Sequence, residues 1–250
     1  MLNILEPLRA KLVLAQAGAS YMTGLVGNIS IPAYSGSQVT WEGEVADAKD
    51  GAGTFTEVKL EPHRLTAYID LSKQFLIQDS VSAEEMLKRD IVNAIANKLE
   101  ATILGSETIV NAPEGMLNGV VADSSAITYE DIVAMETELE EANVRGDIKF
   151  VVSPSAKAKL KTTKLDAGSG KFAMEGNEVN GYPVLCTSAV AGKGVIYGNF
   201  NDLVIGQWGG IDLTVDPYTQ AANGKVRLVI NAYFDAKLRR AESFVKKILA

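Results

Sequence analysis

Few side chains in this 250-residue sequence stand in a spacing that could do chemistry. The stretch AGSGK, residues 167–171, is the one that resembles a phosphate-binding loop. A Walker motif requires a glycine five positions before the Gly-Lys pair and a serine or threonine after the lysine. Those two positions hold Leu165 and Phe172, so the pattern fails. We therefore predict a surface loop here.

The remaining reactive residue types are equally unpromising. His63 is the only histidine, which excludes a histidine-based metal site, and no G-x-S-x-G elbow is present. Cys186 is the only cysteine and lies in the apolar run YPVLCTSAV, which predicts a buried, unreactive thiol and no intrachain disulfide. The acidic pairs Glu84–Glu85 and Glu140–Glu141 fit solvated helix surfaces better than acid/base catalysis. We predict no catalytic residue, metal or cofactor, and hence no enzyme.

Composition and charge agree with a globular protein. The sequence is 47% hydrophobic, with a net charge of -7 and a pI near 4.9, which does not suit a nucleic-acid binder. The most basic segment, residues 237–247, alternates like an ordinary strand. No apolar run is long enough for a transmembrane helix, and charged residues interrupt the N-terminal segment, so it is no secretory signal. We expect a soluble protein made in a cytoplasm.

Residues 35–60 predict a long β-hairpin. Val39, Trp41 and Val45 alternate with polar residues on one limb, and Val58 and Leu60 do so on the other. A limb of about 12 residues is about 40 Å long, whereas a chain of this size has a radius of gyration of about 18 Å. Either another molecule covers the hairpin, or it lies flat on its own domain with Trp41 in the core.

Two helices are predicted, each with a capping pattern at its start. Ser82 and Glu85 form a capping box before a helix at about 83–104, and Thr128 and Asp131 cap a helix at 129–143. The first helix carries an apolar stripe, with Glu100 among the residues expected to face away from it. The stripe residues are Leu87, Ile91, Ile95, Leu99 and Ile103.

The rest of the chain reads as an arm and a series of strands. Residues 1–28 predict an arm with a short amphipathic helix, and residues 63–72 a strong strand. After residue 147 the pattern is rich in strands, with one short helix after Pro154. Helices and strands do not alternate as βαβ units, so the fold class is α+β.

The order of these features resembles the major capsid proteins of tailed bacteriophages, with the Hong-Kong-97-like fold that encapsulin nanocompartments share. The resemblance rests on GNISIPAYSGSQVTWEGEV, FTEVKLEPHRLTAYIDLSKQFLIQDS, FVVSPSAKAKLKTTKLDAGSGKF, VNGYPVLCTSAV and VINAYFDAKLRRAESFVKK, in this order. It covers nearly the whole chain, and no single piece is diagnostic.

The resemblance implies a division of the chain. Residues 1–28 would be the N-terminal arm, and 29–70 an extended hairpin, the E-loop, that lies across a neighbouring subunit. Residues 71–126 and 217–250 would form the peripheral P-domain, with its spine helix at about 83–104. Residues 127–216 would form the axial A-domain, whose 165–180 loop points toward a five- or six-fold axis.

The resemblance also implies contact residues and partners. Candidate inter-subunit contacts are Trp41, Glu42, Glu44, Lys49, Phe55, Lys171 and Phe172. Partners would be copies of the same chain in pentamers, hexamers and a shell around double-stranded DNA, and in assembly a scaffolding segment, a prohead protease and a portal. DNA would be enclosed without sequence-specific binding, and no membrane would be involved.

Two departures from the family pattern affect this interpretation. Many members begin with a scaffolding segment that a protease removes, and none precedes Leu2, which fits a processed form, a trimmed chain or a member without one. Some members join an E-loop lysine to an asparagine beside a catalytic glutamate. Lys49 would be the lysine, but the glutamate position holds Asn231 and the asparagine position Gly224, beside Asn223. We therefore expect a shell without covalent cross-links.

Three functions remain open at this point. The leading one is the major capsid subunit of a tailed phage or prophage, found in the virion. The second is an encapsulin-like shell that holds cargo enzymes, which would differ in particle size and contents. The third is an unrelated α+β enzyme or small-molecule binder, which would need a cluster of titratable residues in one pocket.

Overall fold

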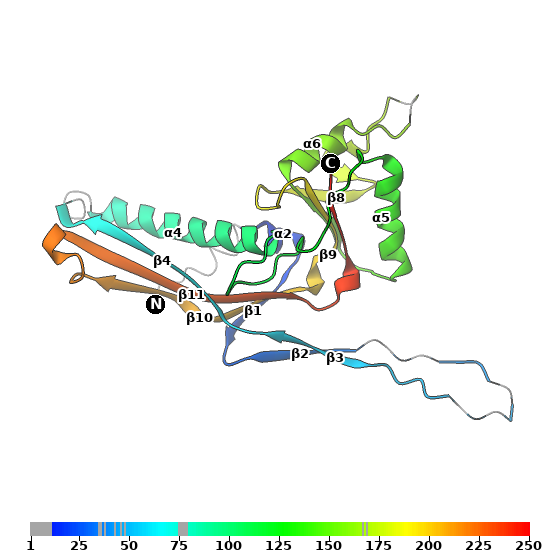
Figure 1. Cartoon of the computed structure of the whole chain (residues 1–250), viewed down its shortest axis with the longest axis horizontal. Coiled ribbons are helices and arrows are strands. Elements are labelled where there is room, and N and C mark those ends of the chain that lie inside the picture. Colours follow the sequence, from blue (N-terminus) through cyan, green and yellow to red (C-terminus); the bar gives the residue numbers. More distant parts are fainter. Residues whose placement is uncertain are drawn as a thin grey trace.

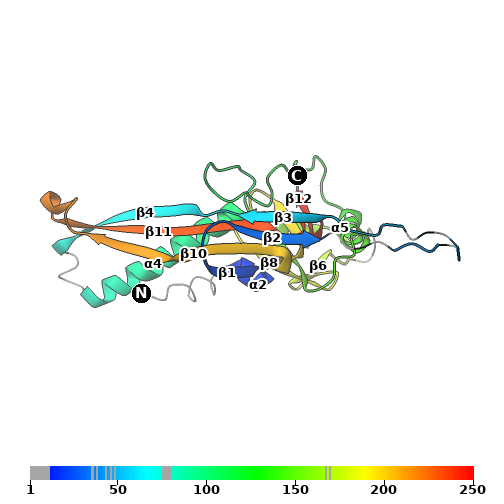
Figure 2. The same ribbon diagram turned by 90° about the horizontal axis from the view of Figure 1, so that it is seen from below.

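The computed structural model describes residues 12–34, 37, 39–42, 44–45, 47, 49–74, 80–166, 168 and 170–250. The molecule is long and thin, and a narrow two-stranded ribbon leaves its body (Figures 1 and 2). Two sheets form the body, each with helices packed on it. The mixture of helices and sheets confirms the predicted α+β class.

The first sheet has four strands in the order β1-β10-β11-β4. Its strands are β1 (Ser20–Leu25), β10 (Leu203–Asp216), β11 (Lys225–Leu238) and β4 (His63–Ser72). β10 and β11 are antiparallel, with 14 residues each, and β1 runs parallel to β10. The prediction treated residues 1–28 as an arm and missed β1, because its pairing with β10 joins residues about 180 positions apart.

Helix α4 (Ser80–Ile103) is the long helix that packs on this sheet (Figure 1). Ile91, Ile95 and Leu99 are buried in one core with Ile230 and Phe234 of β11, which confirms the predicted stripe. The helix already includes Ser80, so Ser82 is not its N-cap, and the side chains of the predicted capping box lie outside the described residues.

Glu100 was predicted to face solvent, and this was wrong. Only 6% of its surface is exposed, and its Oε1 accepts a hydrogen bond from the backbone amide of Leu14 at 3.1 Å. Leu14 belongs to the short helix α2 (Val13–Ala17), which no side chain of its own N-cap residue caps. The glutamate is therefore buried because it satisfies a backbone donor at the start of α2.

The second sheet has six strands in the order β12-β9-β5-β8-β7-β6. They are β12 (Phe244–Ile248), β9 (Gly194–Asn199), β5 (Ile148–Val152), β8 (Tyr182–Cys186), β7 (Glu178–Val179) and β6 (Met174–Glu175). Helices α5 (Tyr129–Glu141) and α6 (Pro154–Thr162) share one core with it. In that core the rings of Phe150 and Tyr197 stack, with centroids 4.1 Å apart.

The predicted cap of α5 is confirmed. Thr128 accepts from the amide of Asp131, whose carboxylate accepts from the amide of Thr128 at 2.7 Å. Cys186, in contrast, is exposed and not buried as predicted. Its side chain lies on the same face of β8 as the buried Val184, but at the last position of the strand, beyond the core.

Each of the two sheets contains strands from both sides of the domain boundary predicted at residue 216. β10 precedes that boundary and pairs with β11, while β12 follows it and pairs with β9. The basic segment 237–247 is likewise no single strand, because the 3-10 turn η3 (Ala241–Ser243) separates β11 from β12. Two further 3-10 turns are η1 (Phe200–Asp202) and η2 (Ala221–Asn223). The division into arm, E-loop, P-domain and A-domain remains a prediction.

Candidate inter-subunit surfaces

The ribbon (residues 29–60) is the most distinctive feature of the molecule. β2 (Ile29–Tyr34) and β3 (Phe55–Leu60) pair antiparallel, from Ile29 with Leu60 to Tyr34 with Phe55. Beyond this pair the chain continues well past the body in both views (Figures 1 and 2). The described residues between 37 and 54 form no strand, so the predicted alternation at 39–45 does not mark the paired segment.

A small hydrophobic cluster fixes the root of the ribbon. Leu60 is fully buried against Val204 and Trp208 of β10, and partly buried residues of β1 and β2 complete the cluster. The Trp208 indole N–H also donates a hydrogen bond to the carbonyl of Gly27. Burial of a leucine side chain contributes about 2 kcal/mol, so the packing of Leu60 helps to hold the root of the ribbon on the body.

A buried carboxylate also holds the root of the ribbon. Asp235 of β11 is 1% exposed; its Oδ2 accepts from the amide of Glu61 at 2.9 Å and its Oδ1 from the amide of Ala236 at 2.8 Å. Glu61 lies in the short junction between β3 and β4, where the chain passes from the two-stranded ribbon to the four-stranded sheet. Burial raises the pKa of Asp235, while the two amides and then His63, 3.8 Å away, oppose this shift.

The ribbon beyond its root is exposed. Val39, Trp41, Val45 and Phe55 are 95%, 103%, 98% and 78% exposed. The possibility that the hairpin lies flat with Trp41 in the core is therefore wrong. Monomeric soluble proteins rarely leave several large apolar side chains in one exposed segment unless that segment binds something.

The polar candidates of the ribbon lie along the same segment. Glu42, Glu44 and Lys49 are exposed residues, and Lys49 Nζ forms an ion pair with Glu42 Oε1 at 2.8 Å, across the tip. Such an exposed pair contributes little stability, about 0–1 kcal/mol. It ties the two limbs together without attaching either to the body.

Lys171 and Phe172 lie elsewhere, in the loop after α6. Phe172 pairs with Lys164 in an isolated bridge, and the amide of Leu165 donates to the Lys171 carbonyl at 3.1 Å. This loop and the ribbon leave the body at well-separated places (Figure 1). The predicted contact residues therefore form two groups and not one site. The stretch AGSGK was predicted to be a surface loop. Its Gly170 has a φ of 68°, a backbone conformation that glycine adopts readily in loops and turns.

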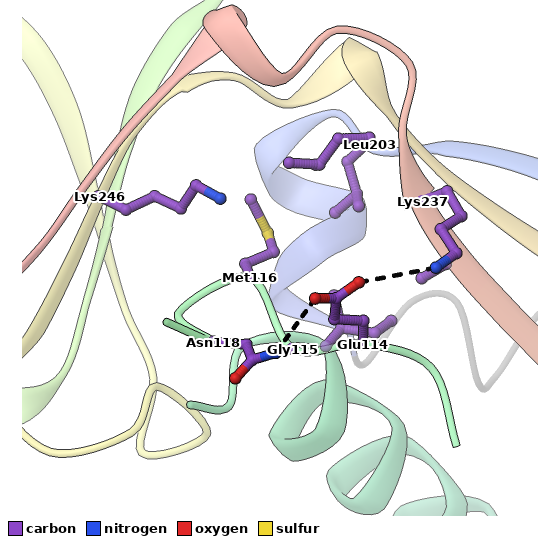
Figure 3. A pocket seen from close by; sticks show the side chains of 10 residues that line it. Glu114, Gly115, Met116, Asn118, Leu203, Lys237 and Lys246 are labelled. Atoms are coloured by element: carbon purple, nitrogen blue, oxygen red, sulfur yellow. Dashed lines mark hydrogen bonds and ion pairs between the residues drawn. The ribbon is translucent and has the colours of Figure 1, made fainter. Parts of the chain in front are cut away.

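Figure 3 shows a pocket of about 260 Å³ between the end of α4, β11 and β12. Glu114 accepts from Asn118 Nδ2 at 3.1 Å and lies 3.8 Å from Lys237 Nζ, and Lys246 points into the space from the far side. Burial lowers the pKa of Lys246, and the negative charge of Glu114 opposes this shift. The lining residues include no serine, cysteine or histidine, so the pocket offers no paired nucleophile and base.

No group of three metal-ligating side chains occurs in the described part of the chain. Within the same residues, no helix is long and apolar enough to cross a membrane. Asn231 lies in β11 between Thr66 of β4 and Asp212 of β10, at the position where the resemblance would place a glutamate. The prediction that no cross-link forms stays a prediction.

Comparison with known proteins identifies the family. The profile described as the phage capsid family matches residues 2–247. The chain belongs to the phage capsid family. Within that family, the chain is 27% identical over 245 residues to the major capsid protein of Halomonas phage phiHAP-1, and 24% identical over 230 residues to that of Klebsiella oxytoca phage phiKO2. The alignments cover 96% and 83% of this chain but only 41% and 54% of the relatives, so the chain spans about half their length.

Solved structures agree on the fold of this capsid-family chain. The capsid of a native GTA particle, computed with C5 symmetry, superposes with a TM-score of 0.79 at 19% identity, covering 94% of this chain and 88% of that one. A chain of Gordonia phage Cozz gives 0.72 at 13% identity, covering 95% and 86%. The predicted Hong-Kong-97-like fold is thus confirmed, and a structural rather than enzymatic role agrees with the family.

Proposed function

We propose that this chain is the major capsid subunit of a tailed bacteriophage or prophage. Copies assemble as pentamers and hexamers into an icosahedral head that encloses double-stranded DNA. The observation that carries the proposal is the ribbon, whose apolar residues Val39, Trp41 and Val45 are almost fully exposed in the single chain. A second copy of the chain that covers this segment removes these side chains from water.

The energetics favour this arrangement. Full burial of a large apolar side chain contributes about 1.5–3 kcal/mol, so each ribbon offers several kcal/mol to a contact. Among the described residues β2 and β3 form a sheet of two strands only, and a narrow ribbon of this kind in a lone chain invites aggregation unless something pairs with or shields its edges. A neighbour that lies under each ribbon satisfies both needs around a closed shell.

Shape and symmetry also support the proposal. The body is thin, as a tile of a shell must be, and the ribbon projects roughly along its long direction (Figure 2). The similar GTA capsid structure was computed with C5 symmetry, which is the symmetry of a pentamer. The net charge of -7 suits a wall that encloses DNA without trapping it on its surface.

The finer assignments belong to the same proposal. Glu42, Glu44, Lys49 and Phe55 contact the neighbouring subunit beside Trp41, while Lys171 and Phe172 contact other copies near a five- or six-fold axis. The residue ranges 29–70, 71–126 with 217–250, and 127–216 act as E-loop, P-domain and A-domain. No covalent cross-link forms, since Asn231 cannot act as the base that a carboxylate provides.

Assembly takes place in the bacterial cytoplasm, and the product is the phage head. A scaffolding segment, a prohead protease and a portal take part in assembly, as they do in the family that the sequence resembles. DNA is enclosed without base-specific contacts.

Negative-stain electron microscopy of the purified full chain over a concentration series tests the proposal. We expect five- and six-membered rings or closed shells, whose diameter and contents separate a phage head from an encapsulin-like compartment. Enzyme-filled small particles would replace the phage proposal by the compartment. Single particles at every concentration, also after addition of a scaffolding protein and a portal, would contradict both.

A further inference from the structure

The two helices of the six-stranded sheet carry opposite charges. α5 (Tyr129–Glu141) contains six acidic residues and no lysine or arginine, whereas α6 (Pro154–Thr162) contains three lysines and no acidic residue. The lysines of α6 are Lys157, Lys159 and Lys161, and Lys164 follows directly. One domain therefore presents an acidic helix and a basic helix.

These helices lie at opposite edges of the sheet. α5 packs beside β12 and α6 beside β6, and β12 and β6 are the two edge strands of the order β12-β9-β5-β8-β7-β6. Both helices bury their apolar side chains in the same core on one face of the sheet. Figure 1 shows them on separate flanks of this part of the molecule.

Each flank leaves its charge largely uncompensated. The α5 residues Glu138, Glu140 and Glu141 are exposed, and none has an ion pair within the described residues, where only Asp131 of this helix has one, with Lys247 at 3.8 Å. Lys159, Lys161 and Lys164 are likewise exposed and form no ion pair with described residues.

Like charges also repel within each helix. Glu136 and Glu140 stand four residues apart on α5, as do Lys157 and Lys161 on α6, and such pairs destabilise a helix. Burial raises the pKa of Glu136, and the charge of Glu140 raises it further, against a hydrogen bond from Asn180. An opposite charge from outside the chain relieves the repulsion on both flanks.

We propose that copies of this chain associate head to tail through these flanks, with Glu138 and Glu141 on α5 of one copy facing Lys159 and Lys161 on α6 of the next. The inference rests on the proposed shell function and assigns one interface of its rings. A contact between two different surfaces closes a ring when the rotation from one copy to the next divides a full turn evenly, and five- and six-membered capsomers need such a contact. Complementary charge steers the encounter and selects the register.

Charge reversal tests this pairing in the full-length chain. Variant A carries Glu138→Lys and Glu141→Lys, variant B carries Lys159→Glu and Lys161→Glu, and variant C carries all four changes. A control with Glu107→Lys and Asp212→Lys, both exposed residues outside the six-stranded sheet, changes net charge as variant A does. Native mass spectrometry and electron microscopy at low ionic strength measure rings over a concentration series.

We expect variants A and B alone to need about ten- to a hundredfold more protein than wild type to form rings, since each interface gains like-charge contacts. Variant C and the control form rings close to the wild-type concentration. An equal mixture of A and B forms six-membered but not five-membered rings, because alternating copies match at every interface only in an even-numbered ring.

Two results overturn the inference while the proposed function stands. One is ring formation by A and B at the wild-type concentration, as expected if the α6 lysines bind DNA and not α5. The other is failure of both variant C and the A and B mixture to recover rings that wild type forms. Absence of rings from wild-type protein itself, with scaffolding protein and portal present, contradicts the proposed function and removes the inference with it.

Discussion

Replacement of Asp235 by alanine should loosen the root of the ribbon. The Asp235 carboxylate is the acceptor for the amide of Ala236 inside β11 and for the amide of Glu61 at the junction between β3 and β4. Removing it leaves the Ala236 amide buried without an acceptor, which costs about 1–3 kcal/mol. Glu61 is an exposed residue, so water can replace its lost acceptor at little cost. We expect the free energy of unfolding to fall by about 1–3 kcal/mol.

Urea denaturation and hydrogen exchange together check this expectation. Denaturation gives the global loss, and exchange at the amides of Glu61 and Ala236 shows whether the opening is local to the root. Asp235→Asn is the matched control, because its single amide oxygen keeps one of the two hydrogen bonds and should give an intermediate loss. An alanine variant with stability within 0.5 kcal/mol of wild type and unchanged exchange at both amides would refute the role of Asp235.

The difference in stability between wild type and Asp235→Asn should depend on pH with a definite sign. Burial raises the pKa of Asp235 in the folded chain, so the folded state binds this proton more tightly than the unfolded state. The resulting stabilisation is full below the unfolded pKa and is lost as pH rises through the folded pKa. Wild type should therefore gain stability relative to Asp235→Asn as pH falls from 7 toward 4. An unchanged or opposite difference in urea denaturation would contradict this sign.

Two further predictions concern helix α4 and the ribbon tip. Glu100→Ala should lower the free energy of unfolding by about 1–3 kcal/mol, because the buried amide of Leu14 loses its acceptor, while Glu100→Gln keeps an acceptor oxygen and should lose less; urea denaturation compares them. Trp41→Ala should change single-chain stability by no more than about 0.5 kcal/mol, since the side chain is fully exposed, yet raise the concentration needed for assembly at least about tenfold. Light scattering against the neighbouring control Thr40→Ala measures this, and equal assembly of both variants would contradict it.

Helices α4 and α5 could be predicted from the sequence, because their patterns involve residues only a few positions apart. The stripe of Ile91, Ile95 and Leu99 predicted α4 because helical spacing alone places these side chains on one face. Thr128 and Asp131 predicted the start of α5, because a capping box needs only residues three positions apart.

Features set by distant partners were missed. Glu100 is buried only because the amide of Leu14, 86 residues away in sequence, needs an acceptor. Pairing between β1 and β10 and the support of Glu61 by Asp235 also join remote segments, and no periodicity encodes them. Cys186 was placed in the core from its apolar neighbours, whereas its position at the end of β8 exposes it.

The ribbon shows where sequence reasoning about the candidate site ends. Alternation predicted an extended hairpin but could not decide whether Trp41 packs on its own domain, because both arrangements need the same pattern. The structure decides against self-packing, since Trp41, Val39 and Val45 are exposed. What covers these residues depends on a second molecule, and no pattern in one chain contains that information.

Photo-cross-linking from position 41 tests the central claim most directly. The full chain is prepared with photoreactive benzoylphenylalanine in place of Trp41, in nitrogen-14 and nitrogen-15 forms that are mixed before assembly. Mass spectrometry of cross-linked peptides then separates links within one chain from links between chains. With the two forms mixed in equal amounts, the proposal predicts that about half of the links from position 41 in assembled particles join a light to a heavy chain, which is the value for links made between chains at random. Links confined to single chains within assembled particles would contradict it.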